Sequence, residues 1–321
     1  MTTQFQNVNE PHILSHGSQE ETIEQTIERI KAKIQKAGDK PHVTVERQLQ
    51  IVDELAGFPF GCFLLQNRGL DGYWADYMVY YYPSKGRMTG LDPQGRPFTE
   101  FEKLAFDKFP LVLATQQRFV HFGQVIHKHV KDGSILASLP CGLMRDLLSL
   151  DFTGVENFRL VGIDIDPKAL EDAKQLAEEL GLSDNVGFFK TDAWNLPFQD
   201  RFTLLTSNGL NVYEHDDVKV TELYRQFFKV LAPGGVLVTS FSTPPPVLDP
   251  NSEWDMTRID QEALLLQKIV FYDVLDAKWQ CFRTSKTTLS QLQTVGFCEI
   301  EFIYDDAHIF PTVVAHKPDK I

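Results

Sequence analysis

A glycine turn and two aspartates in the second half of the chain have the spacing of a nucleotide pocket. The turn, Pro140–Gly142, follows the apolar run ILASL, and Asp164 comes about 22 residues after Gly142. Asp192 ends a later apolar run. A glycine lets a ligand approach the backbone, and a carboxylate at this distance can accept hydrogen bonds from both ribose hydroxyls. The alternatives are a ligand-free strand-to-helix turn at Gly142 and a turn residue at Asp164.

The residues beside these anchors complete the predicted cofactor pocket. Asp192 would accept a hydrogen bond from an adenine amino group, and the backbone of Ala193 or Trp194 would meet a ring nitrogen. The Trp194 ring either stacks on the base or packs in the core. The remaining predicted lining is Pro140, Cys141 and Ile165.

The segment NVYEHDD, after the fourth apolar run, carries the candidate catalytic side chains Tyr213, Glu214 and His215. A general base helps when the reacting group is a hydroxyl or an amine. For His215 the alternative is a polar residue at a helix start. Upstream, Tyr73 and Tyr77 in GYWADYMVYYY are predicted to close the substrate pocket, with a packed aromatic cluster as the alternative.

Neither a metal site nor a cysteine nucleophile is expected. His121, His127 and His129 have spacings that turn their rings apart on one helix. Cys141 has no histidine beside it in the sequence, which favours a small turn residue over a nucleophile. The four cysteines are scattered without a C-x-x-C pair, so neither a disulfide framework nor a zinc site is indicated.

Composition limits the class of protein and of partner. The 321 residues, 43% of them hydrophobic, can form one large core or two smaller ones. A formal net charge of −13 disfavours nucleic acid, which leaves a small molecule or a basic protein as the expected partner. Because no run of about 18 apolar residues occurs and the N-terminal stretch is polar, we expect a cytoplasmic protein without a membrane span. The oligomeric state does not follow from the sequence.

The elements that must position these side chains alternate between short apolar runs and amphipathic helices. Asp166 and Pro167, for example, mark the start of a helix after the second run. This alternation predicts a doubly wound α/β fold with a mostly parallel sheet. The expected strands are residues 134–139, 159–165, 186–191, 202–208 and 235–241, with two closing strands at 299–305 and 312–317.

The region before residue 133 has a different texture and is predicted to be a mainly helical cap. One helix would carry Ile23, Ile27, Ile30 and Ile34 on one face, with Ser18 and Glu21 as its capping box. Residues 41–98 are expected to be irregular, and a further helical stretch would begin at Thr99 and Glu102. The predicted units are therefore a helical cap, 1–132, and a cofactor-binding domain, 133–321.

Four stretches of the second half resemble one family, the class I S-adenosylmethionine-dependent methyltransferases. They are VGIDIDPKALEDAKQLAEELGL, FKTDAWNLPF, LYRQFFKVLAPGGVLVTSF and LSQLQTVGFCEIEFIYDD, within Gly133 to Lys317. The resemblance implies a Rossmann-like fold whose final strand, TVVAHK, inserts antiparallel. It also implies S-adenosyl-L-methionine as cofactor, S-adenosyl-L-homocysteine as product, and methyl transfer to a small molecule or a protein. The N-terminal region has no such match.

The chain departs from the family pattern at two motifs. In the first motif Ser138 and Pro140 stand where an acidic residue is usual, and only Gly142 remains of the glycines. Asp146 could then replace the missing contact to the cofactor amine, with a surface ion pair as the alternative. In the fourth motif Thr203 replaces the usual aspartate, which leaves Asn208 and Gly209 at the methionine end.

Two other functions remain open. The degenerate first motif, which keeps only Gly142 of the usual glycines, is compatible with a binding protein that has lost catalysis. An NAD(P)-dependent oxidoreductase would share the turn and the ribose carboxylate, but the missing G-x-G-x-x-G and the LAPGG stretch before a strand disfavour it.

Overall fold

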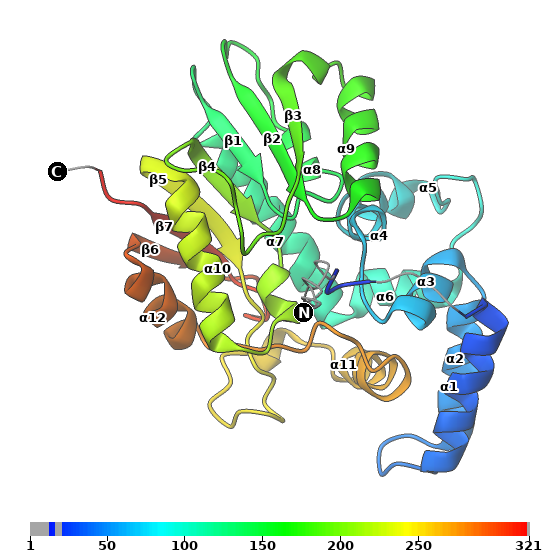
Figure 1. Cartoon of the computed structure of the whole chain (residues 1–321). Helices are drawn as coiled ribbons and strands as arrows, with labels where there is room; N and C mark the ends of the chain where they lie inside the picture. The colour runs from blue at the N-terminus through cyan, green and yellow to red at the C-terminus, as the bar shows by residue number, and fades with distance from the viewer. Residues whose placement is uncertain (1–12, 17–20, 320–321) are drawn as a thin grey trace, which may run out of the picture.

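The computed structural model describes residues 13–16 and 21–319. Its centre is a seven-stranded sheet in the order β3-β2-β1-β4-β5-β7-β6 (Figure 1). The strands are β1 (Ile135–Ser138), β2 (Arg159–Asp164), β3 (Val186–Lys190), β4 (Phe202–Ser207), β5 (Leu231–Ser240), β6 (Cys298–Ile303) and β7 (Thr312–His316).

Strands β1 to β5 pair in parallel, and β7 lies antiparallel between β5 and β6. The predicted fold class is thereby confirmed, and so is the antiparallel insertion of TVVAHK. The sheet order reverses between β1 and β4, the neighbours at the centre. Connections leave in opposite directions from such a switch point, which opens a crevice outside the carboxyl ends of the strands. Every predicted cofactor residue lies at or after one of these strand ends.

Helices cover both faces of the sheet. Asp166 caps α9 (Pro167–Glu179) by accepting from the Lys168 amide, as predicted. The other helices of the domain are α10 (Asp217–Val230), α12 (Ser285–Val295) and the short η2 (Ser183–Asn185), η3 (Leu210–Tyr213) and η4 (Met256–Arg258). The turn at Gly142 leads into a single helical turn, α8 (Arg145–Leu148), preceded by Met144 in a left-handed conformation. The sequence predicted that a helix starts at this turn, and in the structure that helix is only the four residues of α8.

The N-terminal region is helical, as predicted, and residues 41–98 are far more regular than expected. The helices are α1 (Ile23–Ala37), α2 (Val45–Ala56), α3 (Pro59–Asn67), α4 (Gly72–Asp76), η1 (Tyr77–Gly86), α5 (Arg87–Thr89), α6 (Glu100–Lys108) and α7 (Pro110–His127). Thr99 and Glu102 form the predicted capping box of α6. The capping box of α1 consists of Thr22 and Gln25 instead of Ser18 and Glu21, and Ser18 lies outside the described residues.

The helical layer is not contiguous in sequence. Its apolar core includes residues of α2, α3 and α6 together with Ile269, Val270, Phe271 and Val274 from the second half of the chain. These four residues belong to η5 (Ile269–Val274), which continues α11 (Gln261–Lys268). The helix α11 packs beside α7, and η5 packs beside α2. In Figure 1 this layer lies against one end of the sheet. A chain division at residue 132 therefore separates segments that share one core.

Among the described residues, no helix has both the length and the apolar character that a bilayer crossing requires.

Candidate cofactor and acceptor site

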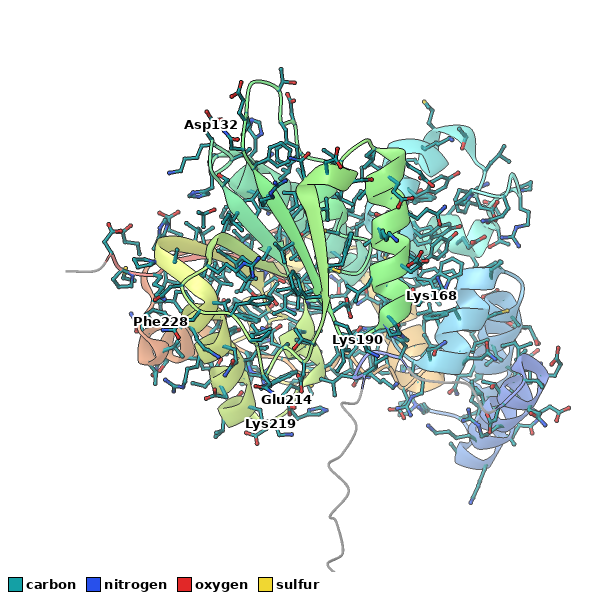
Figure 2. All side chains as sticks on the ribbon, turned by 45° about the horizontal axis from the view of Figure 1, so that its top comes forward. Asp132, Lys168, Lys190, Glu214, Lys219 and Phe228 are labelled. Atoms are coloured by element: carbon teal, nitrogen blue, oxygen red, sulfur yellow. The ribbon has the colours of Figure 1, made fainter. Side chains whose placement is uncertain are left out.

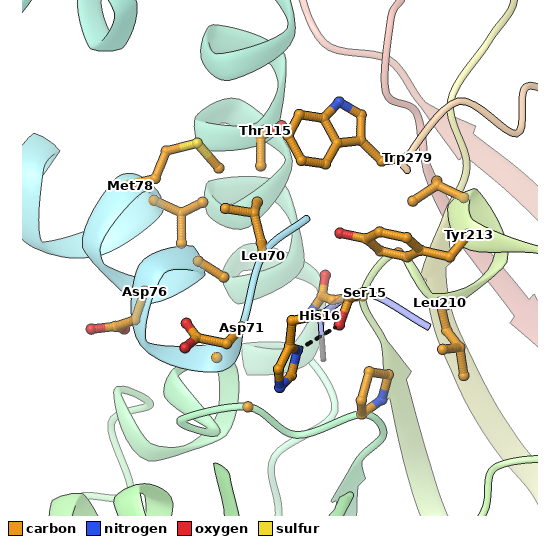
Figure 3. Close-up of a pocket in the computed structure, with 18 of the residues that line it drawn as sticks. Ser15, His16, Leu70, Asp71, Asp76, Met78, Thr115, Leu210, Tyr213 and Trp279 are labelled. Carbon is orange, nitrogen blue, oxygen red and sulfur yellow. Dashed lines mark hydrogen bonds between the residues drawn. The ribbon is translucent and has the colours of Figure 1, made fainter. Parts of the chain in front are cut away.

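A cavity of about 310 Å³ lies where the carboxyl ends of the strands face the helical layer. Figure 3 shows Leu70, Asp71 and Met78 on one side of it and Tyr213 on the other. The sheet side consists of the loops after β1, β2, β3 and β4, and the opposite side comes from α3, α4, η1, α6, α7 and η5. One cavity thus joins the strand ends to the helical layer.

The structure brings the whole predicted cofactor set to this cavity. The residues lie in four separate loops, and their convergence follows from the parallel sheet, since parallel strands end at the same edge. Their contact with a cofactor stays a prediction. The residues are Pro140, Cys141, Gly142, Asp146, Asp164, Ile165, Asp192, Ala193, Trp194, Asn208 and Gly209.

The Asp164 carboxylate links the loop after β1 to the loop after β2 by hydrogen bonds. One carboxylate oxygen accepts from the Gly142 amide at 3.0 Å, and the other accepts from the Asp166 amide at 3.0 Å. The side chain is buried, and burial raises the pKa of this carboxyl group. Each oxygen has a second lone pair, so the carboxylate can still accept from a ligand hydroxyl.

Gly142 lies where the backbones of the sheet domain and the helical layer are in close contact. Its φ is +49°, in the left-handed region, and a β-carbon placed on it would lie 3.1 Å from the Gly72 Cα atom. A β-carbon on Gly72 would in turn lie 2.6 Å from the Gly142 Cα atom. Both glycines are therefore required by close packing of two backbones, and the turn at Gly142 carries a structural role in addition to its place in the cavity.

Asp146 is buried rather than paired at the surface. Its carboxylate accepts from Ser138 Oγ at 3.0 Å and from Thr206 Oγ1 at 2.5 Å, at the ends of β1 and β4. Burial raises the pKa of Asp146, and the two hydroxyl donors counteract part of that shift. The neighbouring Arg145 forms the ion pair in this region, with Asp76 at 2.7 Å.

The buried carboxylate predicts a pH-dependent stability. Because the folded state raises the pKa of Asp146 above its ordinary 3.8, ionisation of this group destabilises the fold as pH rises above that value. We expect the free energy of unfolding of the parent, relative to that of Asp146→Asn, to decrease as the pH increases above 3.8. Urea denaturation of both proteins at a series of pH values measures the difference. A difference that does not change with pH would contradict the assignment.

Of the three predicted catalytic side chains, only one lines the cavity. Tyr213 lines the cavity, where its ring points inward (Figure 3). Glu214 accepts from the Asp216 amide and lies 3.5 Å from Lys219 Nζ. Figure 2 labels both residues in the same part of the molecule. His215 is exposed beside a separate, shallow hollow. The short helix η3 ends at Tyr213, and this turn directs the next two side chains away from the cavity. Burial raises the pKa of the Tyr213 hydroxyl, so this group is a hydrogen-bond donor at neutral pH.

Tyr73 and Tyr77 are placed in the alternative environment, an aromatic cluster of the helical layer. The Tyr77 ring lies 5.7 Å from that of Tyr81 and 5.1 Å from that of Trp74. Tyr77 is 5% exposed, and neither tyrosine is among the residues that line the cavity. The cavity wall formed by this region comes instead from residues such as Leu70 and Met78.

We therefore expect Tyr77→Ala to affect stability and not the cofactor. Removing a buried aromatic side chain leaves a hole that costs about 3–5 kcal/mol of unfolding free energy. Chemical denaturation should show this loss, while calorimetry should find the S-adenosylhomocysteine affinity within about twofold of the parent, a change below the 1.4 kcal/mol of a tenfold effect. Tyr73→Ala, at a half-buried position, should cost less. A selective loss of ligand affinity in either variant would restore the predicted role in substrate binding.

Sequence reasoning missed the apolar lining of the cavity and one charged residue within it. Apolar side chains of the lining include Leu55, Phe58, Leu64, Phe101, Phe109, Val112, Phe271 and Trp279. Arg118, on α7, also lines the cavity and is 9% exposed. A sequence signal for it exists, because Ala114, Arg118 and Phe122 follow the i, i+4 spacing of one buried helix face. An arginine within such a face must find a partner or a ligand.

Comparison with known proteins finds a methyltransferase domain in this part of the chain. Residues 131–283 match the family model described as a methyltransferase domain. A sterol 24-C-methyltransferase from Pneumocystis carinii (strain B80) is 24% identical over 132 residues, which are 40% of this chain and 32% of that protein. Methyltransferase phqN from Penicillium fellutanum is 30% identical over 108 residues, 33% of this chain and 31% of that protein. The chain thus spans about a third of the length of these curated relatives.

A crystal structure described as a possible exported protein from Bordetella parapertussis is similar over nearly the whole chain. The identity is 40%, the TM-score is 0.85, and the match covers 92% of this chain and 95% of that one. A match of this extent includes most of the helical layer as well as the sheet. The arrangement of the helical layer and the sheet is therefore shared by the two proteins.

Proposed function

Because residues 131–283 match the family model of a methyltransferase domain, we propose that the chain transfers a methyl group from S-adenosylmethionine to a small molecule. The observation that carries the proposal is the convergence of the eleven predicted cofactor residues on one cavity with an apolar opposite wall. A cavity between the sheet and the helical layer, with an apolar wall, suits a small acceptor better than a protein side chain, which has to enter from a surface. The match of about a third of the curated relatives' length leaves the acceptor open.

The residues present fit the cofactor. Asp164 would accept from the ribose hydroxyls, Asp192 would face the adenine amino group, and Asp146 would attract the methionine amine. Gly142, which also lines the cavity, carries no side chain that would occupy it. When bound, S-adenosylmethionine supplies an electrophilic methyl group on a sulfonium, so the chain's task is to position the acceptor and exclude water. Tyr213 is the predicted catalytic residue that stands in the cavity and can donate a hydrogen bond there.

A binding protein without catalysis is the second candidate, supported by the single glycine of the first motif. The same cavity and the same aspartates would serve it. An oxidoreductase is disfavoured by that single glycine, since dinucleotide sites normally need more than one for the pyrophosphate.

Calorimetry with S-adenosylhomocysteine and with NAD⁺ tests the cofactor class. We expect saturable binding of the first and none of the second, and the reverse result would overturn the proposal. Incubation with S-adenosylmethionine carrying a labelled methyl group and fractions of a small-molecule extract then tests catalysis. Binding of S-adenosylhomocysteine without transfer to any fraction would favour the non-catalytic candidate.

We further propose that the protein acts in the cytoplasm, without nucleic acid or a membrane as partner. The support is that Cys62, Cys141, Cys281 and Cys298 carry free thiols, as is usual in a reducing compartment. Cell fractionation with an antibody against the protein tests the location. Recovery outside the cytoplasm, as the description of the Bordetella protein suggests for that protein, would contradict it.

A further inference from the structure

Arg118 is a buried cation in the cavity without a carboxylate partner among the described residues. Two other basic side chains of the lining are paired, Arg145 with Asp76 and His16 with Asp166. Arg118 Nη1 donates to Ser240 Oγ at 3.1 Å, while Nε has no hydrogen-bond partner in the described part of the chain. A guanidinium group offers five donors, so most of its capacity is unused.

Aromatic packing holds this side chain in place. The guanidinium carbon lies 4.1 Å from the centre of the Phe310 ring and 5.9 Å from that of Phe122. Phe310 is itself fixed, because Asp305 accepts from its amide at 2.6 Å and from the Ile309 amide at 3.1 Å. Burial lowers the pKa of Arg118 to about 10, which still leaves it charged at neutral pH. The cavity therefore contains a preorganised, protonated and unsatisfied anion receptor.

The position of Arg118 indicates which ligand it would meet. It contacts Ser240 at the end of β5 and Phe310 just before β7, whereas Asp164 ends β2. In the sheet order three strand intervals separate β2 from β5, or roughly 14 Å at about 4.8 Å for each interval. The ribose side and Arg118 thus lie well apart within the site. The end with Arg118 also contains Tyr213 and Trp279 and continues into the apolar wall.

We propose that the acceptor is an apolar molecule with a carboxylate, and that Arg118 binds this carboxylate. The inference rests on the proposed function and names its substrate class. A planar guanidinium can hold both oxygens of a carboxylate at once, and the aliphatic and aromatic wall accommodates the rest of the molecule. The paired arginine, Arg145, is the matched control, because its charge is already neutralised by Asp76.

The test compares decanoate with 1-decanol, which differ in charge but share the apolar chain. Calorimetry is done on the full chain saturated with S-adenosylhomocysteine. The parent should bind decanoate at least about tenfold more tightly than 1-decanol, which is the gain expected from one charged hydrogen-bonded pair. Arg118→Met should remove this preference and leave the 1-decanol affinity within about twofold, while Arg118→Lys should retain part of it. Arg145→Met should keep the preference of the parent. Melting temperatures identify variants that fail to fold. If Arg118→Met fails to fold, the proposal is judged on Arg118→Lys, which should retain only part of the preference for decanoate.

Three results would overturn the proposal. The parent could show no preference for decanoate, Arg118→Met could keep the preference, or Arg145→Met could lose it equally. If Arg118→Met instead weakened S-adenosylhomocysteine about tenfold and kept the decanoate preference, Arg118 would belong to the cofactor carboxylate. Titration of the parent with S-adenosylhomocysteine alone tests the proposed function separately. If the parent did not bind S-adenosylhomocysteine, the proposed function would fail, whatever the preference for decanoate.

Discussion

Replacing Gly142 with valine is expected to abolish detectable S-adenosylhomocysteine binding and to lower the melting temperature. The residue has a φ of +49°, and a β-branched side chain in that region costs about 1–3 kcal/mol. The added atoms would also meet the Gly72 backbone, 3.1 Å from the β-carbon position. The loop would have to move, and with it the Gly142 amide that donates to Asp164. Calorimetry and thermal denaturation of the same preparation measure both effects.

Gly133→Val is the matched control for this variant. Gly133 has a φ of +77° but no neighbour within 4 Å of a β-carbon, and it precedes β1 outside the cavity lining. It should lower stability through backbone strain alone and leave the ligand affinity within about twofold, well under the 1.4 kcal/mol of a tenfold change. If both variants bound S-adenosylhomocysteine equally well, the Gly142 turn would be a structural feature with no part in the cofactor site.

The sheet and the cofactor side of the cavity could be predicted because both depend on local patterns. Apolar runs such as RLVGID identify strands buried on both faces, and the carboxyl ends of parallel strands meet at one edge. Asp164 and Asp192 were therefore assigned to one site from their position after a strand. The same reasoning predicted the N-terminus of α9, because Asp166 and Pro167 act within a single helical turn.

The helical layer could not be predicted to the same degree, because contacts between distant segments shape it. The glycines and prolines of residues 41–98 suggested irregular structure, yet Pro59 simply begins α3 and Gly61 lies against the Leu55 backbone. The packing of Phe271 against Phe109 joins segments that no local pattern connects. Glu214 and His215 leave the site because a short helix ends just before them. Side-chain direction at a loop depends on such turns, which residue types alone do not specify.

Replacing Asp164 with alanine is expected to weaken S-adenosylhomocysteine binding by about 1–3 kcal/mol, roughly five- to 150-fold in Kd. The variant removes the predicted acceptor of both ribose hydroxyls. It also removes the acceptor of the Gly142 and Asp166 amides, so a loss of stability should accompany the loss of affinity. A weaker ligand could therefore reflect either a lost contact or a displaced loop.

Adenosine and 2′,3′-dideoxyadenosine separate these two causes, because the second lacks the ribose hydroxyls. The parent should prefer adenosine, and Asp164→Ala should bind both nucleosides with nearly equal affinity, since the energies of two groups in contact are coupled. Displacement of the loop alone would weaken both ligands by the same factor and preserve the preference. Asp166→Ala is the appropriate control, because Asp166 caps α9 two residues further on and should leave the preference intact. A preference that survives in Asp164→Ala would remove the ribose contact from this residue and leave Asp164 as the acceptor that joins two loops.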